Sequence, residues 1–249
     1  MTTKRLQEVI QLNNEGVNLL CSPILSHSNL AMQCFSQAIN VAFSLTPNGG
    51  GNQRSHMDSR NADADEWNLF SSATVPIVFP EHHDIFYFFD QGIYIQPDLP
   101  LAHKECTEED ALQLLTAILL LNTALGCCQI AYAHLFQQQR EKANRIFSKA
   151  LHLYHSVEEL AQNFDSLAKP SYNSFLFFRL VALNNYSWLC LQMGMHAECR
   201  KAQSIIPSHV ESGDWSLPRG AMVFIEELYL NSKMLAMTDL FSALPASAA

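Results

Sequence analysis

Basic residues are scarce in this sequence. It holds 15 Lys and Arg against 24 Asp and Glu in 249 residues, which gives a formal net charge of −9. A phosphate backbone is repelled by that average charge, and no run of basic residues offsets it locally. We therefore expect no nucleic acid among the main partners.

The short motifs around which many catalytic sites are built are also missing. The sequence has no G-x-S-x-G and no P-loop lysine motif. Its triple glycine, residues 49–51, is followed by Asn and Gln instead of the Lys-Ser that opens a phosphate-binding helix. These absences predict a protein that is not an enzyme and that carries no cofactor.

No C-x-x-C pair occurs among the 7 cysteines, most of which lie in apolar stretches. Free Cys in such a setting behaves as a small apolar residue and suits a reducing compartment. The first 16 residues contain no apolar core long enough for a signal peptide. We therefore expect a cytoplasmic protein, with the nucleus as an alternative.

Charge is absent from one long stretch, because residues 111–136 contain no Asp, Glu, Lys or Arg. A helix of this length could cross a bilayer. Polar side chains recur along it, however, which favours a central helix buried by its neighbours; they are Gln113, Thr116, Asn122, Thr123, Gln129 and His134. Membrane attachment through residues 111–136 stays as an alternative.

What the sequence does contain is helical periodicity. An Ala-aromatic-Ala pattern with spacings of four and three residues occurs twice, at Ala31, Phe35 and Ala38 and at Ala143, Phe147 and Ala150. Residues at this spacing share one face of a helix, and small residues there let a second helix approach closely. The pattern predicts paired helices.

Pro, Gly and polar clusters divide the chain into segments. They predict one mostly α-helical domain over residues 1–249, with a first helix pair over 4–45, a flexible loop over 46–72, an inserted β-hairpin over 73–97, a second helix pair over 107–164, a third over 171–207 and a C-terminal capping helix over 217–242. The hairpin is expected to turn at Asp90-Gln91-Gly92. Gly194 and Pro207 are expected to end the fifth and sixth helices.

These residues resemble the tetratricopeptide-repeat (TPR) family, whose units of about 34 residues each pair two helices. The positions that match the family's repeat signature are Gly16, Ala31, Phe35, Ala38, Ala143, Phe147, Ala150 and Gly194. The resemblance implies antiparallel helix pairs stacked in a right-handed α-α superhelix. In the second unit the small residue of the first helix is either Ala131 or Ala124, and the latter follows Asn122.

In such an array the first helix of each pair lines a concave groove that binds peptides or helices. Asn13, Asn14 and Asn185 lie at or near groove-lining positions, where an amide can donate to and accept from a bound backbone. The competing interpretation is that they cap turns or contact water. The resemblance thus implies a non-catalytic scaffold that binds a protein or peptide partner, whose identity stays open along with the oligomeric state.

Two further features leave alternatives open. The run Glu81-His82-His83-Asp84 holds the ligand types of a divalent-metal site, although a solvated turn is the simpler explanation and we expect no metal. A metal-binding or enzymatic protein centred on this run is the runner-up to the scaffold. The hairpin aromatics Phe86, Phe88, Phe89 and Tyr94 either cover the groove as core or present a surface to a partner.

Overall fold

The computed structural model describes residues 2–45, 70–74, 77, 88–95, 108–163, 172–212 and 219–237. Within these ranges the chain is mostly helical, as its periodicity predicts. The helices are α1 (Thr2–Leu20), α2 (Leu25–Leu45), α3 (Glu108–Phe136), α4 (Arg140–Asn163), α5 (Tyr172–Gln192), α6 (His196–Ser212) and α7 (Arg219–Met237). The strands are β1 (Phe70–Thr74) and β2 (Gln91–Ile95).

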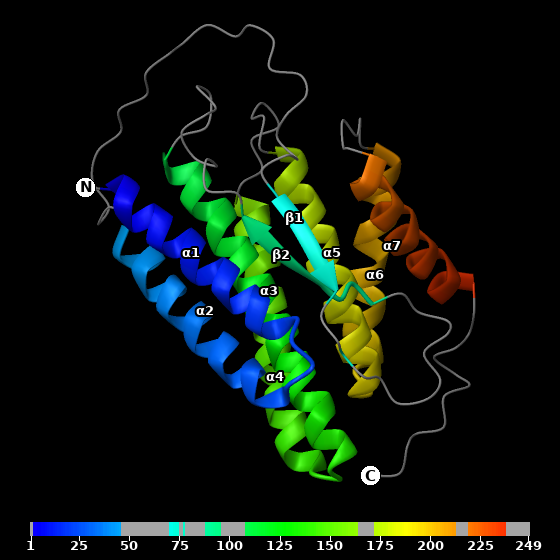
Figure 1. Cartoon of the computed structure of the whole chain (residues 1–249). Coiled ribbons are helices and arrows are strands. Elements are labelled where there is room, and N and C mark those ends of the chain that lie inside the picture. The colour runs from blue at the N-terminus through cyan, green and yellow to red at the C-terminus, as the bar shows by residue number, and fades with distance from the viewer. Residues whose placement is uncertain are drawn as a thin grey trace, which may run out of the picture.

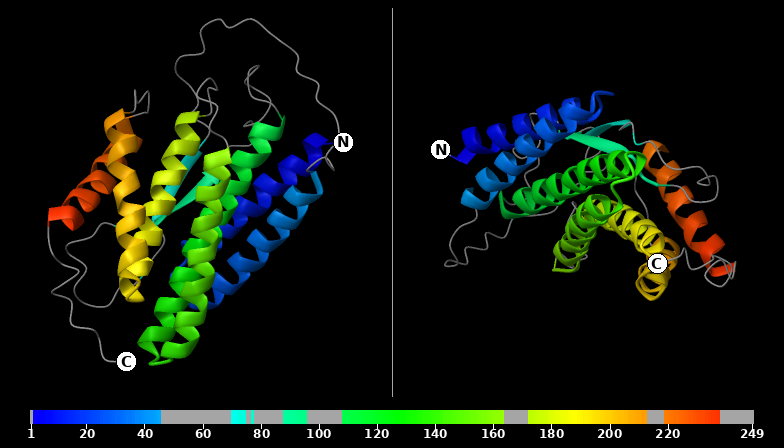
Figure 2. Two further views of the ribbon diagram at one scale, coloured as in Figure 1. Left: turned by 180° about the vertical axis from the view of Figure 1, so that it is seen from behind. Right: turned by 90° about the horizontal axis from the view of Figure 1, so that it is seen from below.

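Each helix packs on the next one along the chain. Short turns join α1 to α2, α3 to α4 and α5 to α6, so these helices form antiparallel pairs (Figure 1). Contacts also link α1 with α3, α3 with α5, and α5 with α7. Figure 2 shows both strands on the side of α3 that faces away from α4. The layer of α1, α3 and α5 therefore carries the sheet.

Small residues allow the helices of the first pair to approach closely. Gly16 of α1 lies against the ring of Phe35 in α2, and a Cβ at position 16 would collide with that ring. Phe35 is fully buried, as are Ala31 and Ala38 on the same face of α2. The periodic face predicted for this helix is thus its buried face.

The second pair uses an aromatic contact at the same place. Phe147 of α4 meets Tyr132 of α3 edge to face, with ring centroids 5.0 Å apart, and Ala143 and Ala150 beside it are buried. The Tyr132 hydroxyl accepts a hydrogen bond of 2.8 Å from the indole nitrogen of Trp188 in α5. This bond satisfies a buried hydroxyl and ties the second pair to the third.

Two turns between helices are built alike. Gly194 follows α5 with a φ of 73°, and the amide of Met195 donates back to the carbonyl of Cys190 over 2.7 Å. The predicted helix end at Gly194 is confirmed. After α3 the same turn has Gln138 at a φ of 58°, and the amide of Gln139 donates to the carbonyl of His134 over 2.8 Å.

The central helix is α3. Its segment Ala111–Phe136 is long and apolar enough to cross a membrane, and its most apolar window has a mean hydropathy of 1.9, but 83% of that window is buried. It contacts α1, α2, α4, α5 and β2. Burial among these neighbours accounts for its apolar composition, as for the core helix of a globular fold.

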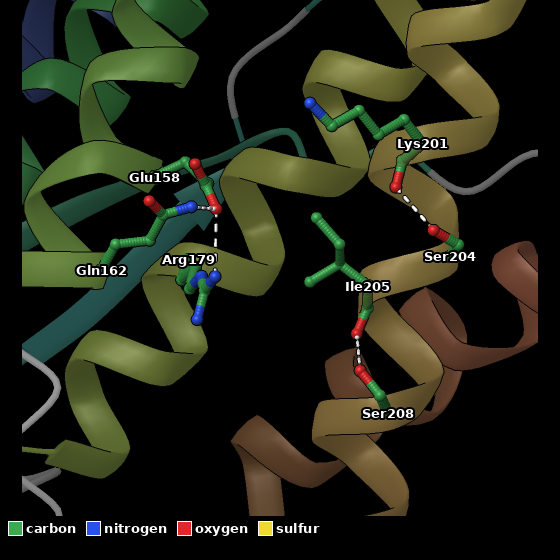
Figure 3. Close-up of polar contacts among 7 residues, drawn as sticks. All are labelled: Glu158, Gln162, Arg179, Lys201, Ser204, Ile205 and Ser208. Atoms are coloured by element: carbon green, nitrogen blue, oxygen red, sulfur yellow. Dashed lines mark hydrogen bonds and ion pairs between the residues drawn. The ribbon is translucent and has the colours of Figure 1, made fainter.

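A buried ion pair joins α4 to α5. Nη2 of Arg179 lies 3.0 Å from Oε1 of Glu158, and both side chains are largely buried. Gln162 donates a second hydrogen bond to the same carboxylate oxygen, and both donors converge on Glu158 (Figure 3). Removing either charge would leave the other buried and unpaired, which costs more than the pair itself contributes.

The prediction that α6 stops at Pro207 is wrong, because the helix runs through this residue to Ser212. A proline inside a helix removes one backbone hydrogen bond. Hydroxyl groups on either side of it donate to backbone carbonyls, Ser204 to Lys201 over 2.8 Å and Ser208 to Ile205 over 2.7 Å (Figure 3). The packing of α6 on α5 and α7 holds the helix together past the proline.

The two strands are antiparallel, with Phe70 opposite Ile95 and Thr74 opposite Gln91. The predicted turn at Asp90-Gln91-Gly92 is wrong, because Gln91 and Gly92 lie inside β2. The sheet also begins within the predicted loop 46–72. Residues 46–69 of that loop lie outside the described residues, as do 75–87 apart from Ile77.

Candidate functional site

The main chain of β2 is held by asparagine side chains from the helices, and the central one is Asn122 of α3. Its Oδ1 accepts from the amide of Ile93 over 2.9 Å, and its Nδ2 donates to the carbonyl of the same residue over 2.9 Å. We call this two-bond arrangement an asparagine clamp. Asn13 of α1 adds a bond of 3.0 Å to the Ile93 carbonyl and accepts one of 2.9 Å from Asn122. Asn13 and Asn122 are fully buried.

A second asparagine clamp comes from α1. Asn14 accepts from the amide of Ile95 over 2.8 Å and donates to the carbonyl of Ile95 over 2.7 Å. This clamp is half-buried. One turn further along α1, Asn18 accepts from the hydroxyl of Tyr94 over 2.9 Å. The end of β2 is thus fixed to α1 through both main chain and side chain.

The third clamp comes from α5 and holds the chain just before β2. Asn185 accepts from the amide of Phe89 over 3.0 Å and donates to its carbonyl over 2.8 Å. Its Nδ2 also donates to the hydroxyl of Tyr154 over 3.2 Å. Asn185 is fully buried. The helices α1, α3 and α5 therefore each contribute one asparagine clamp to residues 89–95.

The clamps leave one edge of β2 for the other strand. In a strand, the N–H and C=O of one residue point to the same side, and the next residue points to the opposite side. Ile93 and Ile95 point to the asparagine side chains, so Gly92 and Tyr94 point to β1. Their partners in the ladder are Ala73 and Ser71.

The side chains of this segment fill the space above the helices. Phe88, Phe89, Ile93 and Ile95 are buried. The ring of Phe89 packs edge to face on Phe177 of α5 and on Phe224 of α7, at centroid distances of 5.9 and 5.2 Å. Phe88 and Phe89 therefore act as core, whereas Tyr94 is half-buried and Phe86 lies outside the described residues.

The titratable groups beside Asn185 are uncharged at neutral pH. Burial raises the pKa of Tyr154 well above its ordinary value, so the hydroxyl beside Asn185 stays protonated. Burial likewise raises the pKa of the Cys128 thiol, whose sulfur lies 3.9 Å from that hydroxyl. At neutral pH these groups offer only dipoles, which is the chemistry that recognises a peptide group rather than an ion.

All three sequence-predicted groove residues, Asn13, Asn14 and Asn185, meet at this site, and all three contact main-chain atoms of this chain's own residues 89–95. Asn122 was not predicted as a site residue. Its signal is a shared spacing: an asparagine stands two residues before a small residue in each of the three helices, at Asn14 and Gly16, Asn122 and Ala124, and Asn185 and Ser187. Whether these residues also bind a partner stays a prediction.

An open cleft of about 480 Å³ runs along α1 beside the second clamp. It is lined by Gln7, Ile10, Gln11, Asn14, Glu15 and Asn18. Its side chains are mainly neutral amides, like those that hold β2.

The candidate metal run at residues 81–84 lies outside the described residues. In the part of the chain that the structure describes, no three His, Cys, Asp or Glu side chains are grouped as a metal site requires. The metal-binding alternative therefore stays untested at its own residues.

Comparison with protein-family models, curated proteins and solved structures returned no significant match. The function is therefore argued from the geometry of the clamp site.

Proposed function

We propose that the protein is a non-catalytic scaffold that binds an extended polypeptide segment of a partner on the sheet that the α1–α3–α5 layer supports. One observation carries the proposal: three asparagine clamps, one from each helix of the layer, hold the N–H and C=O of Ile95, Ile93 and Phe89. A surface that grips peptide groups in this way is suited to an extended chain.

The clamps recognise the backbone and not the side chains. Each amide satisfies one donor and one acceptor of a single residue, and such bonds are available from any residue except proline. The side chains of Ile93 and Ile95, two residues apart, are buried beside the clamps, so the site accommodates the alternate apolar side chains of an extended chain. The partner class is therefore defined by extended conformation and alternating apolar residues.

A TPR-like array is the architecture that this proposal adopts. It is supported by the three antiparallel helix pairs and by the burial of the small and aromatic residues at the signature positions of α2 and α4. The recurring asparagine, two residues before a small residue, adds a third regularity. Superhelical stacking is the standard way in which such pairs build one continuous layer.

Residues 89–95 of this chain already fill the three clamps. A partner segment must therefore pair with the strand β2 that the clamps hold in place. A strand adds to an exposed strand edge through main-chain hydrogen bonds. The layer of helices then acts as a fixed support for a sheet, and the sheet is the surface that meets the partner.

Peptide selection followed by backbone methylation tests the proposal. The full chain is screened against random twelve-residue peptides, and each binder is remade with N-methyl groups at single residues. We expect binders rich in alternating apolar residues that lose at least tenfold in affinity on methylation of every second residue. Failure to select any peptide, or binders that tolerate methylation at every position, would overturn the proposal.

A further inference from the structure

The helix α2 carries no charged residue. Asp, Glu, Lys and Arg make up 16% of the chain, yet residues 16–53 contain none of them. Of the seven helices that the structure describes, α2 is the one without any. A helix at the surface normally carries charged side chains on the face that meets water. An exposed helix face without charge is therefore unusual for a surface whose only contact is with solvent.

The uncharged helix lies at the outside of the molecule. α2 packs on α1 and α3 and forms the outer edge of the helical array in both views (Figures 1 and 2). Two large apolar side chains are exposed on it, Leu30 at 45% and Phe43 at 63%. Between them the exposed residues are a serine and three amides: Gln33, Ser36, Gln37 and Asn40. We call these six residues the α2 face.

Charged side chains of α1 stand at the border of α2. The exposed Arg5 donates from Nη1 to Oγ of Ser44 over 3.4 Å. The exposed Glu15 lies close enough to Cys34 for its charge to raise the pKa of that thiol, although burial has the larger effect. An uncharged centre with charged residues around it is the arrangement typical of a protein interface.

The α2 face is symmetric about its midpoint, between Ser36 and Gln37. Its two apolar residues lie at equal distances on either side of that point, and so do the outer amides Gln33 and Asn40. In a two-fold symmetric contact one patch meets its own copy, so that residue i faces j and j faces i. Two antiparallel α2 helices centred on the midpoint would thus place Gln33 of each copy opposite Asn40 of the other. The apolar residue at each end would approach the opposite end of the other copy's face.

The chemistry of the α2 face is complementary to itself. A side-chain amide both donates and accepts, so one amide can bond to another without a residue of opposite charge. The chain carries a net charge of −9, and two copies repel each other least where neither presents a charge. A partner with a charged face would lose hydration there without gaining an ion pair. These points favour a second copy of this chain over a different protein.

We infer that two copies of this chain associate through the α2 face as an antiparallel, two-fold symmetric dimer. The inference goes beyond the proposed function and does not rest on it, because α2 lies outside the α1–α3–α5 layer and the sheet. The helix has 21 residues and is about 31 Å long. One pair of such helices makes a small interface, so we expect a dissociation constant on the order of micromolar.

Sedimentation equilibrium of the full chain tests the inference, with double variants at the facing positions 33 and 40. Gln33→Glu with Asn40→Glu sets two carboxylates against two others in the dimer and should weaken it at least tenfold. Gln33→Lys with Asn40→Glu leaves the net charge unchanged and creates two ion pairs across the interface. It should tighten the dimer about fivefold. The two positions are seven residues apart on one helix, so the new charges do not pair within a chain.

Two further variants serve as controls. Gln33→Lys with Asn40→Lys lowers the net negative charge of each chain but again sets like charges against each other, so it should weaken the dimer at least tenfold. Gln33→Lys with Gln37→Glu pairs its charges within one helix and should not tighten the dimer. All these positions are exposed, and circular dichroism checks that each variant is folded. Arg or Asp replaces Lys or Glu in a variant that is not.

A chain that stays monomeric up to about 1 mM, where even a weak interface associates, would overturn the inference. A dimer whose affinity follows net charge, with the Lys pair tightening it and the Glu pair weakening it, would also overturn the inference, because the contact would then lie on another surface. The same holds if no variant changes the affinity. Weakening by both like-charged pairs together with tightening by the opposite pair is the result that supports the α2 face.

Discussion

The two strands of the sheet are paired to each other but are held by different forces. β2 is bonded at Ile93 and Ile95 to side chains from α1 and α3, and both residues are buried in the core. β1 pairs with β2 through the ladder and has a sequence with little preference for a strand. Two paired strands of one sheet can therefore be specified differently, one by long-range hydrogen bonds from the helices and the other by its pairing with the first.

The largest expected effect comes from breaking the central clamp. Asn122→Leu keeps the branched shape of the side chain but removes both bonds to Ile93, which leaves the buried N–H of Ile93 without an acceptor. We expect the free energy of unfolding to fall by about 3 kcal/mol, measured by urea denaturation. The neighbouring Thr123→Val is the control, because its hydroxyl bonds only to Leu119 within α3. If both variants lose the same free energy of unfolding, the clamp contributes no more to stability than an ordinary hydrogen bond within the helix.

A second prediction compares neighbouring residues of one strand. The amides of Ile93 and Ile95 donate to the asparagine side chains of Asn122 and Asn14, whereas those of Gly92 and Tyr94 point to β1. After correction for intrinsic rates, the amide of Ile93 should exchange with solvent about 100-fold more slowly and that of Ile95 about fivefold more slowly, as about 3 and about 1 kcal/mol of added protection require. NMR-detected exchange reads each amide separately. Equal rates at all four would mean that both strands open as one unit.

Local signals predicted much of the helical framework. The spacing of Ala31, Phe35 and Ala38 fixed the buried face of α2, and Gly194 fixed a turn, because both depend on neighbours within one helix turn. Pro207 misled for the opposite reason. The sequence around Pro207 shows only that a proline costs the helix one backbone hydrogen bond. Whether the helix continues depends on the free energy that α6 gains by packing on α5 and α7.

The clamp site needed information that no local pattern carries. Asn14 and Asn185 were predicted to face a bound backbone, but the residues they hold are 81 and 96 positions away in the same chain. Asp90-Gln91-Gly92 has the composition of a turn, yet the clamps on either side keep it extended. Residue propensities describe only local composition, so they cannot predict such long-range hydrogen bonds.

A smaller effect is expected at the half-buried clamp. Asn14→Leu removes two bonds to Ile95, as Asn122→Leu does at Ile93, but solvent lies close enough to replace them. Because water recovers part of each lost bond, the free energy of unfolding should fall by about 1 kcal/mol. The same urea titration measures it. A loss of stability as large as that of Asn122→Leu would mean that the contribution of a clamp to stability does not depend on its burial.

The smallest expected effect comes from improving β1. Ser72→Val places a β-branched residue opposite Ile93 and should strengthen the ladder by about 0.5 kcal/mol. Since that energy acts only on the opening of β1, exchange at Gly92 and Tyr94 should slow about twofold while exchange at Ile93 and Ile95 stays unchanged. Slower exchange at all four residues would show that β1 and β2 open together and would remove the distinction between them.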